Sequence, residues 1–445
     1  MEGHLIIILA LLFVLGACVA SLLNAAIYAW AWTPRRVSPW QPTPTGAAPR
    51  SWADCVPIFG WLRLRRDGAV LGKGFWIRPL LIEIGFGAAL AALYWWEVDQ
   101  HGLIVAQLPF VTKLHHANLF SVLLWQFAAH AILAALMVIA TFIDFDEQTI
   151  PDYVTWPGLW IGLGLMTFAP TALLPNVEPQ PAPPPIGVAL KDDQGIQLFG
   201  RPPFTDSLYL EPVTAVAPNR WPAALAGNPN RGSLLIGLGC WWLWCFAVAY
   251  RPWRSRPTFS RNLRLCLARL WQSLRCQPLR EITLLGTLII AMVWYSGGTA
   301  WTGLLSSLIG MVGAGGVVWA VRIIGSAALG REAMGFGDVT LMMMVGAYVG
   351  WQAGLIIFFL APFAGLLMGA AKLLLRGDKE IPYGPFLCLA TALLVVRWAN
   401  IWPAIERFFA IGPLVPAVMI VCLVLLGVML GLLQLMKRLL GIDRY

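Results

Sequence analysis

The segment Arg331–Gly350, REAMGFGDVTLMMMVGAYVG, carries a single aspartate, Asp338, just before a long apolar run. A carboxylate is costly at the edge of a bilayer, so an acid in this position is by default a candidate functional residue. A structural role is also open, because Asp338 follows Gly337 at an expected helix start, where a carboxylate caps free backbone N–H groups. Taken alone, the segment supports both interpretations.

The composition explains why a bilayer is expected. Of the 445 residues, 59% are hydrophobic and only 12% are charged, and the mean hydropathy is +0.71. These values exclude an ordinary soluble globular protein. The net charge of +9 resides in short loops between apolar runs, which indicates membrane orientation and lipid contact rather than nucleic-acid binding. We therefore predict an all-α polytopic membrane protein, a bundle of about 9–11 transmembrane helices with a cytosolic loop after the first helix.

Apolar runs of about 20 residues are long enough to cross a bilayer. They predict helices at 5–32, 79–97, 119–143, 154–175, 233–250, 281–298, 301–325, 339–351, 353–375, 384–402 and 412–435. The run 339–351 is too short for an ordinary span.

The loop arginines predict the orientation of these helices. The 33–78 loop holds seven arginines and Lys73, and the 251–280 loop holds eight arginines, whereas 98–118 holds only Lys113. Cytosolic loops carry the positive excess, so the N-terminus is expected outside. Asp144 then ends the third span and Asp338 begins the eighth on the same, cytosolic, face.

Two acids on one membrane face can do chemistry that neither can do alone. Asp144 lies in FIDFDEQTIPDYVTWPG (142–158), a cluster that by itself is typical of a solvated turn. Two carboxylates that share a site cannot easily both ionise, so one holds a proton while the other activates water. Gly335 and Gly337 would let the backbone approach closely beside Asp338.

Other hydrolytic and metal chemistries find little support. The predicted cytosolic loops contain no histidine, and the eight cysteines form no CxxC pair. A histidine-assisted nucleophile or a ligated zinc is therefore not expected there, and we predict no metal site.

Several segments resemble those of bacterial prepilin peptidases (type IV leader peptidases), which are GxGD membrane aspartic peptidases. They are FIDFDEQTIPDYVTWPG, GREAMGFGDVTLMMMVGAYVGW, GACVASLLNAAIYAW, DCVPIFGWLRLR with IRPLLIE, and EIPYGPFLCLATALL. The resemblance covers most of 10–175 and 301–400, in the family's order.

The resemblance implies a site and an activity. Asp144 and Asp338 correspond to the catalytic pair, with Gly335, Gly337, Asp146, Asp152, Asn24 and Glu83 in supporting positions. Such enzymes remove the leader from type IV prepilins or type II secretion pseudopilins at the cytosolic face of the bacterial inner membrane. The peptidase step needs no cofactor. Many members then methylate the new N-terminus with S-adenosylmethionine.

The chain also departs from the family pattern. Many members carry two CxxC pairs in the first cytosolic loop, where this chain has only Cys55, so zinc is not expected and methylation stays open. Thr340 stands where members often have lysine. The predicted organisation is a first helix (1–32), a basic cytosolic loop (33–78), membrane core with the first Asp (79–175), an inserted outer loop and helix pair (176–300), core with GxGD (301–402), and an extra C-terminal helix (403–445).

Three alternatives stay open. A transporter or channel would use boundary or mid-span polar residues, of which Glu83 and His130 are the nearest. A catalytically silent assembly protein and a GxGD peptidase with a non-pilin substrate are the others. The sequence leaves the oligomeric state open.

Overall fold

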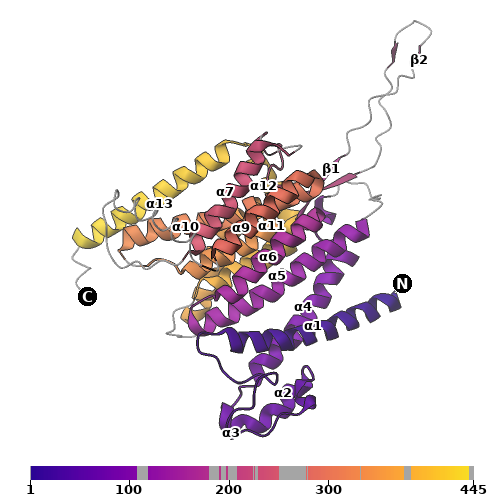
Figure 1. Ribbon diagram of the computed structural model, residues 1–445, viewed down its shortest axis with the longest axis vertical. Coiled ribbons are helices and arrows are strands. Elements are labelled where there is room, and N and C mark those ends of the chain that lie inside the picture. Colours follow the sequence, from indigo (N-terminus) through magenta and orange to yellow (C-terminus); the bar gives the residue numbers. More distant parts are fainter. Residues whose placement is uncertain are drawn as a thin grey trace.

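The computed structural model describes residues 2–107, 119–179, 190–191, 197–198, 208–223, 225, 229–249, 277, 279–330, 332–374 and 382–439. This part of the chain is almost entirely helical (Figure 1). Nine of its helices are long and apolar enough to cross a membrane. The prediction of an all-α polytopic membrane protein is therefore confirmed. Most of the arginine-rich 251–280 loop lies outside the described residues.

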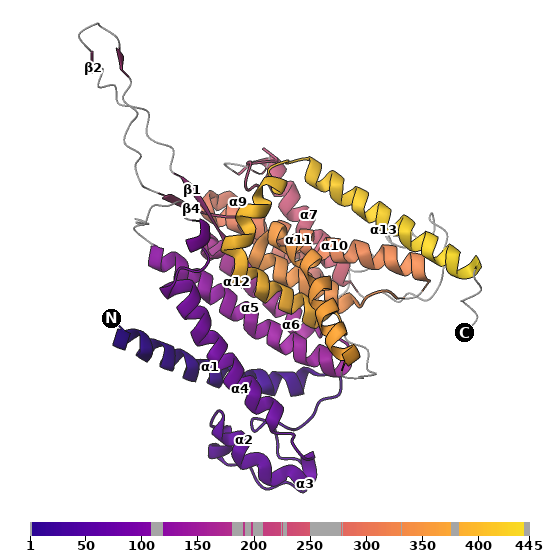
Figure 2. The ribbon, with the colours of Figure 1, turned by 180° about the vertical axis from the view of Figure 1, so that it is seen from behind.

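Helices α1 (Glu2–Trp30) and α4 (Ile77–Tyr94) form the first packed pair. They touch through glycines, because a Cβ atom on Gly16 would lie 2.8 Å from the Gly87 Cα. The chain between them forms a separate lobe, the α2–α3 subdomain (residues 33–76). This lobe contains the 3₁₀ turns Trp52–Cys55 and Arg65–Asp67 and the short helices α2 (Phe59–Leu64) and α3 (Gly68–Leu71). Figures 1 and 2 show it at the end of the molecule away from β1.

The α2–α3 subdomain has its own small core and buried ion pairs. Trp61 and Leu64 are fully buried against Tyr28 and Val37. The buried Asp54 pairs with Arg66 at 2.7 Å and with Arg63 at 3.2 Å. Arg50 reaches the buried Asp67 at 2.6 Å. Ion pairs with buried carboxylates therefore supplement the small apolar core of this subdomain.

We predict that this subdomain loosens in acid through Asp54. Burial would raise the pKa of Asp54, but the Ser51 N–H and the Arg66 and Arg63 guanidinium groups outweigh burial and hold that pKa below 3.8. A lowered folded-state pKa contributes stability that is complete above about pH 4 and is lost as the pH falls through the folded value. The hydrogen-exchange rate of peptides from 50–67, corrected for intrinsic rates, should therefore rise as the pH falls below about 4.

The matched variant is Asp54→Asn. It should exchange faster at pH 7 and respond less to acid than the unmodified chain. Equal acid responses in the two proteins would show that Asp54 is not the group responsible.

The remaining helices build the main bundle. They are α5 (Leu119–Glu147), α6 (Asp152–Phe168), α7 (Arg231–Val248), α9 (Leu279–Ser296), α10 (Gly298–Leu329), α11 (Phe336–Leu374), α12 (Gly384–Phe409) and α13 (Leu414–Leu439). Short helical turns lie at Trp95–Asp99, Val105–Gln107 and Pro170–Ala172. Seen from behind in Figure 2, α12 lies beside α5, and α13 lies along the outside of α10.

The predicted outer loop contains paired strands. β1 (Pro175–Pro179) pairs antiparallel with β4 (Leu208–Pro212), and β2 (Leu190–Lys191) pairs with β3 (Gln197–Leu198). This strand pairing was not predicted, because the sequence indicated only an outer loop and a helix pair over 176–300. The chain after β4 returns to the bundle, where the backbone of 214–217 accepts hydrogen bonds from Trp351 and Gln352.

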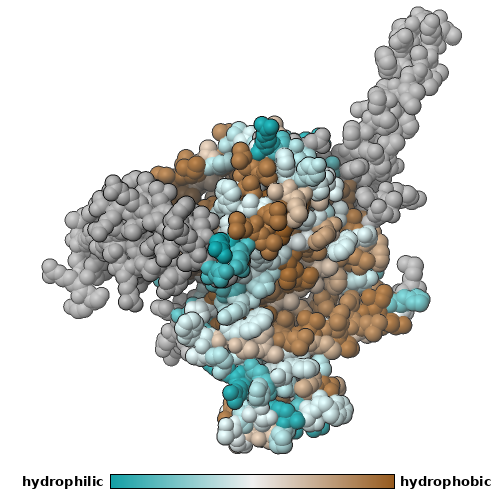
Figure 3. All heavy atoms as spheres, in the orientation of Figure 1, coloured by the Kyte–Doolittle hydropathy of each residue, from teal (hydrophilic) through white to brown (hydrophobic). Residues whose placement is uncertain are grey.

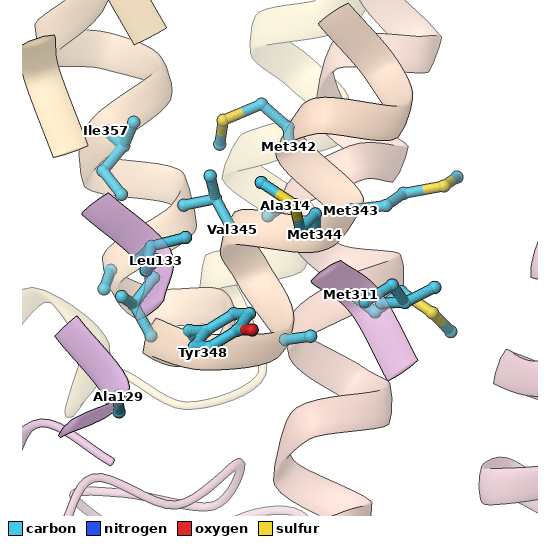
Figure 4. Packing of buried hydrophobic residues seen from close by; sticks show 14 of the residues in the cluster. Ala129, Leu133, Met311, Ala314, Met342, Met343, Met344, Val345, Tyr348 and Ile357 are labelled. Carbon is cyan, nitrogen blue, oxygen red and sulfur yellow. The ribbon is translucent and has the colours of Figure 1, made fainter. Parts of the chain in front are cut away.

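Helix α11 reverses at Gly350, which has φ 82° and ψ 172°. Before the reversal, the contacts on α10 move toward its start as α11 proceeds, from Gly315 (at Met343) to Ser307 (at Ala347). After the reversal they move toward its end, from Gly313 (at Trp351) to Ala314 (at Gly354). The two halves therefore run in opposite directions along α10. In Figure 4, Met342 and Ile357 lie at one level and Tyr348 at another. The short run 339–351 and the run 353–375 are thus two arms of one hairpin, and both ends of α11 face the same side.

The first arm of this hairpin depends on glycine for its contact with α10. A Cβ atom on Gly346 would lie 2.2 Å from the Gly310 carbonyl oxygen, which is backbone and cannot move aside. Small residues allow such close helix packing in membranes. The buried Tyr348 then donates a hydrogen bond to the Gly158 carbonyl oxygen at 2.9 Å, which attaches the arm to α6.

We predict that Gly346→Ala destabilises the protein by about 1–3 kcal/mol, as overpacking of a close contact does. Thermal unfolding of the purified protein in detergent measures this effect. Gly316→Ala on α10 is the matched control, because no atom lies within 4 Å of its added Cβ. Equal unfolding temperatures for the two variants would contradict the proposed contact.

The bundle surface is apolar where a bilayer would cover it. Exposed Ile, Leu and Val side chains line α1 and α13, and Figure 3 shows hydrophobic residues across the middle of the molecule with hydrophilic ones on the α2–α3 subdomain. Such a surface suits a lipid environment.

Candidate functional site

Asp144 lies in the last turn of α5, at the end that leads into the 148–151 connection. Its side chain is only 4% exposed, although the neighbouring Phe145 is 45% exposed. The backbone N–H of Gly384, the first residue of α12, donates to the Asp144 carboxylate. The acid is therefore turned into the bundle rather than toward solvent.

Asp338 lies in the first turn of α11 and is 8% exposed. Its carboxylate accepts a hydrogen bond from the backbone N–H of Gly335, the residue before the helix. This is the arrangement in which an acid in the first helical turn reaches back to the cap position. The capping role considered from the sequence is therefore present. Capping need not be the whole role of Asp338, because its carboxylate also interacts with that of Asp144.

The two acids meet where α5, α11 and α12 converge. Asp144 is close enough to Asp338 for their charges to interact, and the buried Cys388 thiol on α12 interacts with both. Ile150 closes the site, because it lies beside both Gly337 and Gly384. The structure thus brings together two buried carboxylates from distant parts of the chain, as the shared-site hypothesis requires.

Gly384 makes the closest approach in this site. A Cβ atom built on it would lie 2.5 Å from Asp144 Oδ2 and 2.9 Å from Ile150 Cδ1. Its neighbour Tyr383 lies just before the first turn of α12. Burial, together with the nearby Asp338 carboxylate, raises the pKa of Tyr383 to about 12. The phenol is therefore a neutral hydrogen-bond donor at ordinary pH.

The supporting residues predicted from the sequence do not all lie at the pair. Gly335 and Gly337 lie at the pair, and Gly337 is tight because its added Cβ would lie 3.0 Å from Ile150 Cβ. Asp146 is exposed, and its two carboxylate oxygens accept from Arg78 Nη1 at 2.7 and 2.8 Å. Asp152 begins α6 and is exposed.

Asn24 and Glu83 belong to a different cluster, at the junction of α1, α4 and the α2–α3 subdomain. Glu83 is fully buried and accepts hydrogen bonds from the Ile58 N–H at 2.5 Å and from Trp61 Nε1 at 2.7 Å. Asn24 donates to the Pro79 carbonyl oxygen at 3.0 Å. These contacts attach the subdomain to the first helix pair.

His130, the mid-span residue that a transporter interpretation would use, is already paired. Its Nδ1 lies 2.7 Å from Glu97 Oε1, and both side chains are buried. The pair joins α5 to the turn at the end of α4.

Metal ligands are scarce in the described residues. No group of three or more His, Cys, Asp or Glu side chains there could hold an ion. Cys55 is the sole thiol of the α2–α3 subdomain, and its Sγ donates weakly to the Pro39 carbonyl oxygen. A structural zinc needs four such ligands, so the residues of this subdomain do not fit one.

Sequence reasoning missed the contributions of Gly384, Tyr383, Cys388 and Ile150 to the site. Gly384, Tyr383 and Cys388 lie in EIPYGPFLCLATALL, which was recognised as family-like, but only as a helix, and Ile150 lies in FIDFDEQTIPDYVTWPG beside the acids that drew attention there. Gly384 between Pro382 and Pro385 indicated a constrained backbone at a helix start. Nothing in the sequence around it indicated a contact with Asp144.

Comparison with known proteins agrees with the predicted resemblance. Residues 275–370 match the model of the type IV leader peptidase family, a stretch that contains Asp338 but not Asp144. The prepilin leader peptidase/N-methyltransferase of Aeromonas hydrophila is 36% identical over 118 residues, covering 22% of this chain and 41% of that protein. The protein of the same name from Pseudomonas aeruginosa is 33% identical over 86 residues, covering 19% and 29%.

The chain thus spans about two fifths of the length of the first relatives that it matches. No solved structure matches it. The resemblance to prepilin peptidases is confirmed by these matches.

Proposed function

We propose that this protein is a membrane-embedded aspartic endopeptidase that removes the leader from type IV prepilin-like or type II secretion pseudopilin precursors. The observation that carries the proposal is the convergence of Asp144 and Asp338, both buried, at the ends of apolar helices. The names of the relatives supply the substrate class, since they are prepilin leader peptidases.

The chemistry follows from two carboxylates that share one proton. The ionised acid takes a proton from a water molecule, and the resulting hydroxide attacks the scissile carbonyl carbon. The protonated acid donates a hydrogen bond to the carbonyl oxygen, on which negative charge develops. Collapse of the tetrahedral intermediate breaks the C–N bond as the leaving nitrogen gains a proton from the acid that received it from water.

The membrane setting fits the substrate that the family implies. Both acids lie at one end of the bundle, near the 33–78 loop, whose Thr33 and Arg78 contact Glu147 and Asp146 at the end of α5 and whose arginines predict the cytosolic side. The scissile bond of a prepilin precedes an apolar helix that stays in the bilayer. The site therefore faces the cytosol at the inner membrane surface, with the N-terminus of the chain outside.

Methylation of the new N-terminus is the finer part of the proposal. The relatives' names include N-methyltransferase, and such a step would take its methyl group from S-adenosylmethionine. The α2–α3 subdomain, which holds its shape through the Asp54 and Asp67 ion pairs, takes the place of the cysteine-rich loop of many members.

Purified full-length protein incubated with a panel of prepilin peptides tests both steps. Mass spectrometry should show cleavage directly before the apolar segment. Added S-adenosylmethionine carrying a deuterated methyl group should increase the product mass by one labelled methyl. Cleavage of non-pilin membrane peptides alone would instead favour a GxGD peptidase of other specificity. Absence of cleavage in every peptide would contradict the proposal.

A further inference from the structure

The chain next to each acid of the candidate site is contacted by an arginine that sequence reasoning did not single out. Arg78 comes from the first turn of α4, and Arg322 comes from α10. We propose that Arg78 and Arg322 are positioning residues that hold the two acid-bearing segments in place, an inference that rests on the proposed function.

Arg322 holds the chain directly before Asp338. Its Nε donates to the Met334 carbonyl oxygen at 2.9 Å, and its Nη2 lies 2.5 Å from Glu332 Oε1. The guanidinium carbon also lies 5.6 Å from the centre of the Phe336 ring. One side chain thus contacts three alternate residues of the segment that leads into the acid.

The segment needs such a support because it has little regular structure of its own. Helix α10 ends at Leu329, and Gly330 follows with a left-handed φ of 68°. Regular hydrogen bonding resumes only at Phe336. Ser326 adds a second contact from α10, since its Oγ accepts from the Ala333 N–H at 3.1 Å. The position of Asp338 relative to the bundle is therefore set through α10 side chains.

Arg78 holds the last turn of α5 in a corresponding way. Its Nη1 contacts both Asp146 oxygens, and its Nη2 donates to the Phe142 carbonyl oxygen at 3.2 Å. The guanidinium carbon lies 4.8 Å from the Phe142 ring centre. Phe142 and Asp146 flank Asp144 by two residues on either side. A cation at a helix C-terminus also interacts favourably with the helix dipole.

The chemistry of these contacts selects arginine. The planar guanidinium presents several N–H donors in fixed directions and stacks on aromatic rings, whereas lysine offers one compact ammonium. Lysine would keep the charge but could not make the carboxylate, carbonyl and ring contacts together. Replacement by lysine therefore separates geometry from charge.

We expect Arg322→Lys and Arg78→Lys each to lower kcat about 10- to 100-fold, because a misplacement of about 1 Å at reacting groups costs up to this much. KM should change less than about twofold, since both guanidinium groups bind other residues of the chain and their proposed role is to position the acids. Arg280→Gln is the control: Arg280 is also basic but is half-exposed, at the start of α9. Its kinetic constants should stay at wild-type values.

Two further readouts separate positioning from a general loss of structure. Guanidinium ion added to purified Arg322→Ala should restore part of kcat, whereas sodium ion at equal ionic strength should not. Hydrogen exchange should rise in peptides from 330–340 for the Arg322 variants and from 140–148 for the Arg78 variants, with the rest of the chain unchanged. This second readout needs no activity, so it decides the inference even if no prepilin is cleaved.

Wild-type kcat in the lysine variants would overturn the proposal. So would a kcat loss without guanidinium rescue and with hydrogen exchange raised throughout the chain. If no variant at Arg322 or Arg78 accumulates in the membrane, the arginines serve assembly as a whole and the positioning role is wrong.

Discussion

Asp144→Asn and Asp338→Asn should each lower leader cleavage by about 10⁴-fold or more, the loss expected when one member of a catalytic unit is removed. Asparagine has nearly the shape of aspartate but can neither take a proton from water nor hold one for the carbonyl. The double variant should be no slower than either single one, because the two acids act as a unit. Quantifying cleaved and uncleaved prepilin by mass spectrometry measures all three.

The asparagine substitutions also separate catalysis from helix capping. In the Asp338→Asn variant the amide oxygen of the new side chain can still accept the Gly335 N–H, so the start of α11 should be retained. We therefore expect normal accumulation and an unfolding temperature close to that of the unmodified chain. Activity within tenfold of wild type in either variant would rule out the shared-proton mechanism. Loss of the protein from the membrane would indicate a structural role for the acid instead.

Gly384→Ala should lower kcat at least about 100-fold, because it misplaces a reacting group. The added Cβ would lie 2.5 Å from Asp144 Oδ2 and 2.9 Å from Ile150 Cδ1. Both atoms are side-chain ends that can move, so the backbone should keep its path while the carboxylate is pushed aside. The variant should therefore fold normally and fail in turnover. Steady-state kinetics together with thermal unfolding test this combination.

Gly164→Ala on α6 is the matched control, since no atom lies within 4 Å of its added Cβ. Alanine is a better helix former than glycine by up to about 1 kcal/mol, so this control should be as stable as the unmodified chain or more so. Full activity in Gly384→Ala would mean that the Asp144 carboxylate tolerates displacement. That result would weaken the case for a finely positioned pair.

Sequence reasoning predicted best those features that depend only on neighbouring residues, such as an apolar run or an acid at its end. Long apolar runs predicted the spanning helices, and a run too short to cross alone, 339–351, marked the first arm of the α11 hairpin. The two acids were predicted because each interrupts apolar sequence at a helix end. Such signals need only neighbouring residues.

The missed features depend on contacts between distant residues. Gly384 faces Asp144, Arg322 holds the segment before Asp338, and Arg78 holds the end of α5, although nothing near these residues in the chain predicts it. The pairing of β1 with β4 was missed for the same reason. Asp146 was predicted as a supporting residue, but its partner, Arg78, is 68 residues away in the chain and could not be named from the sequence.

The reversal at Gly350 bears on how the protein enters the bilayer during synthesis. The first arm of α11, from Phe336 to Val349, has about 14 residues and a length of ~21 Å. It is shorter than the ~30 Å hydrocarbon layer, so it is a poor candidate for independent insertion by the translocon. We expect the two arms to partition into lipid together, as one unit whose two ends stay on the side of the membrane where the ribosome is. The sidedness of Asp338 would then be decided by the insertion of a hairpin, with no need to translocate the polar segment before it.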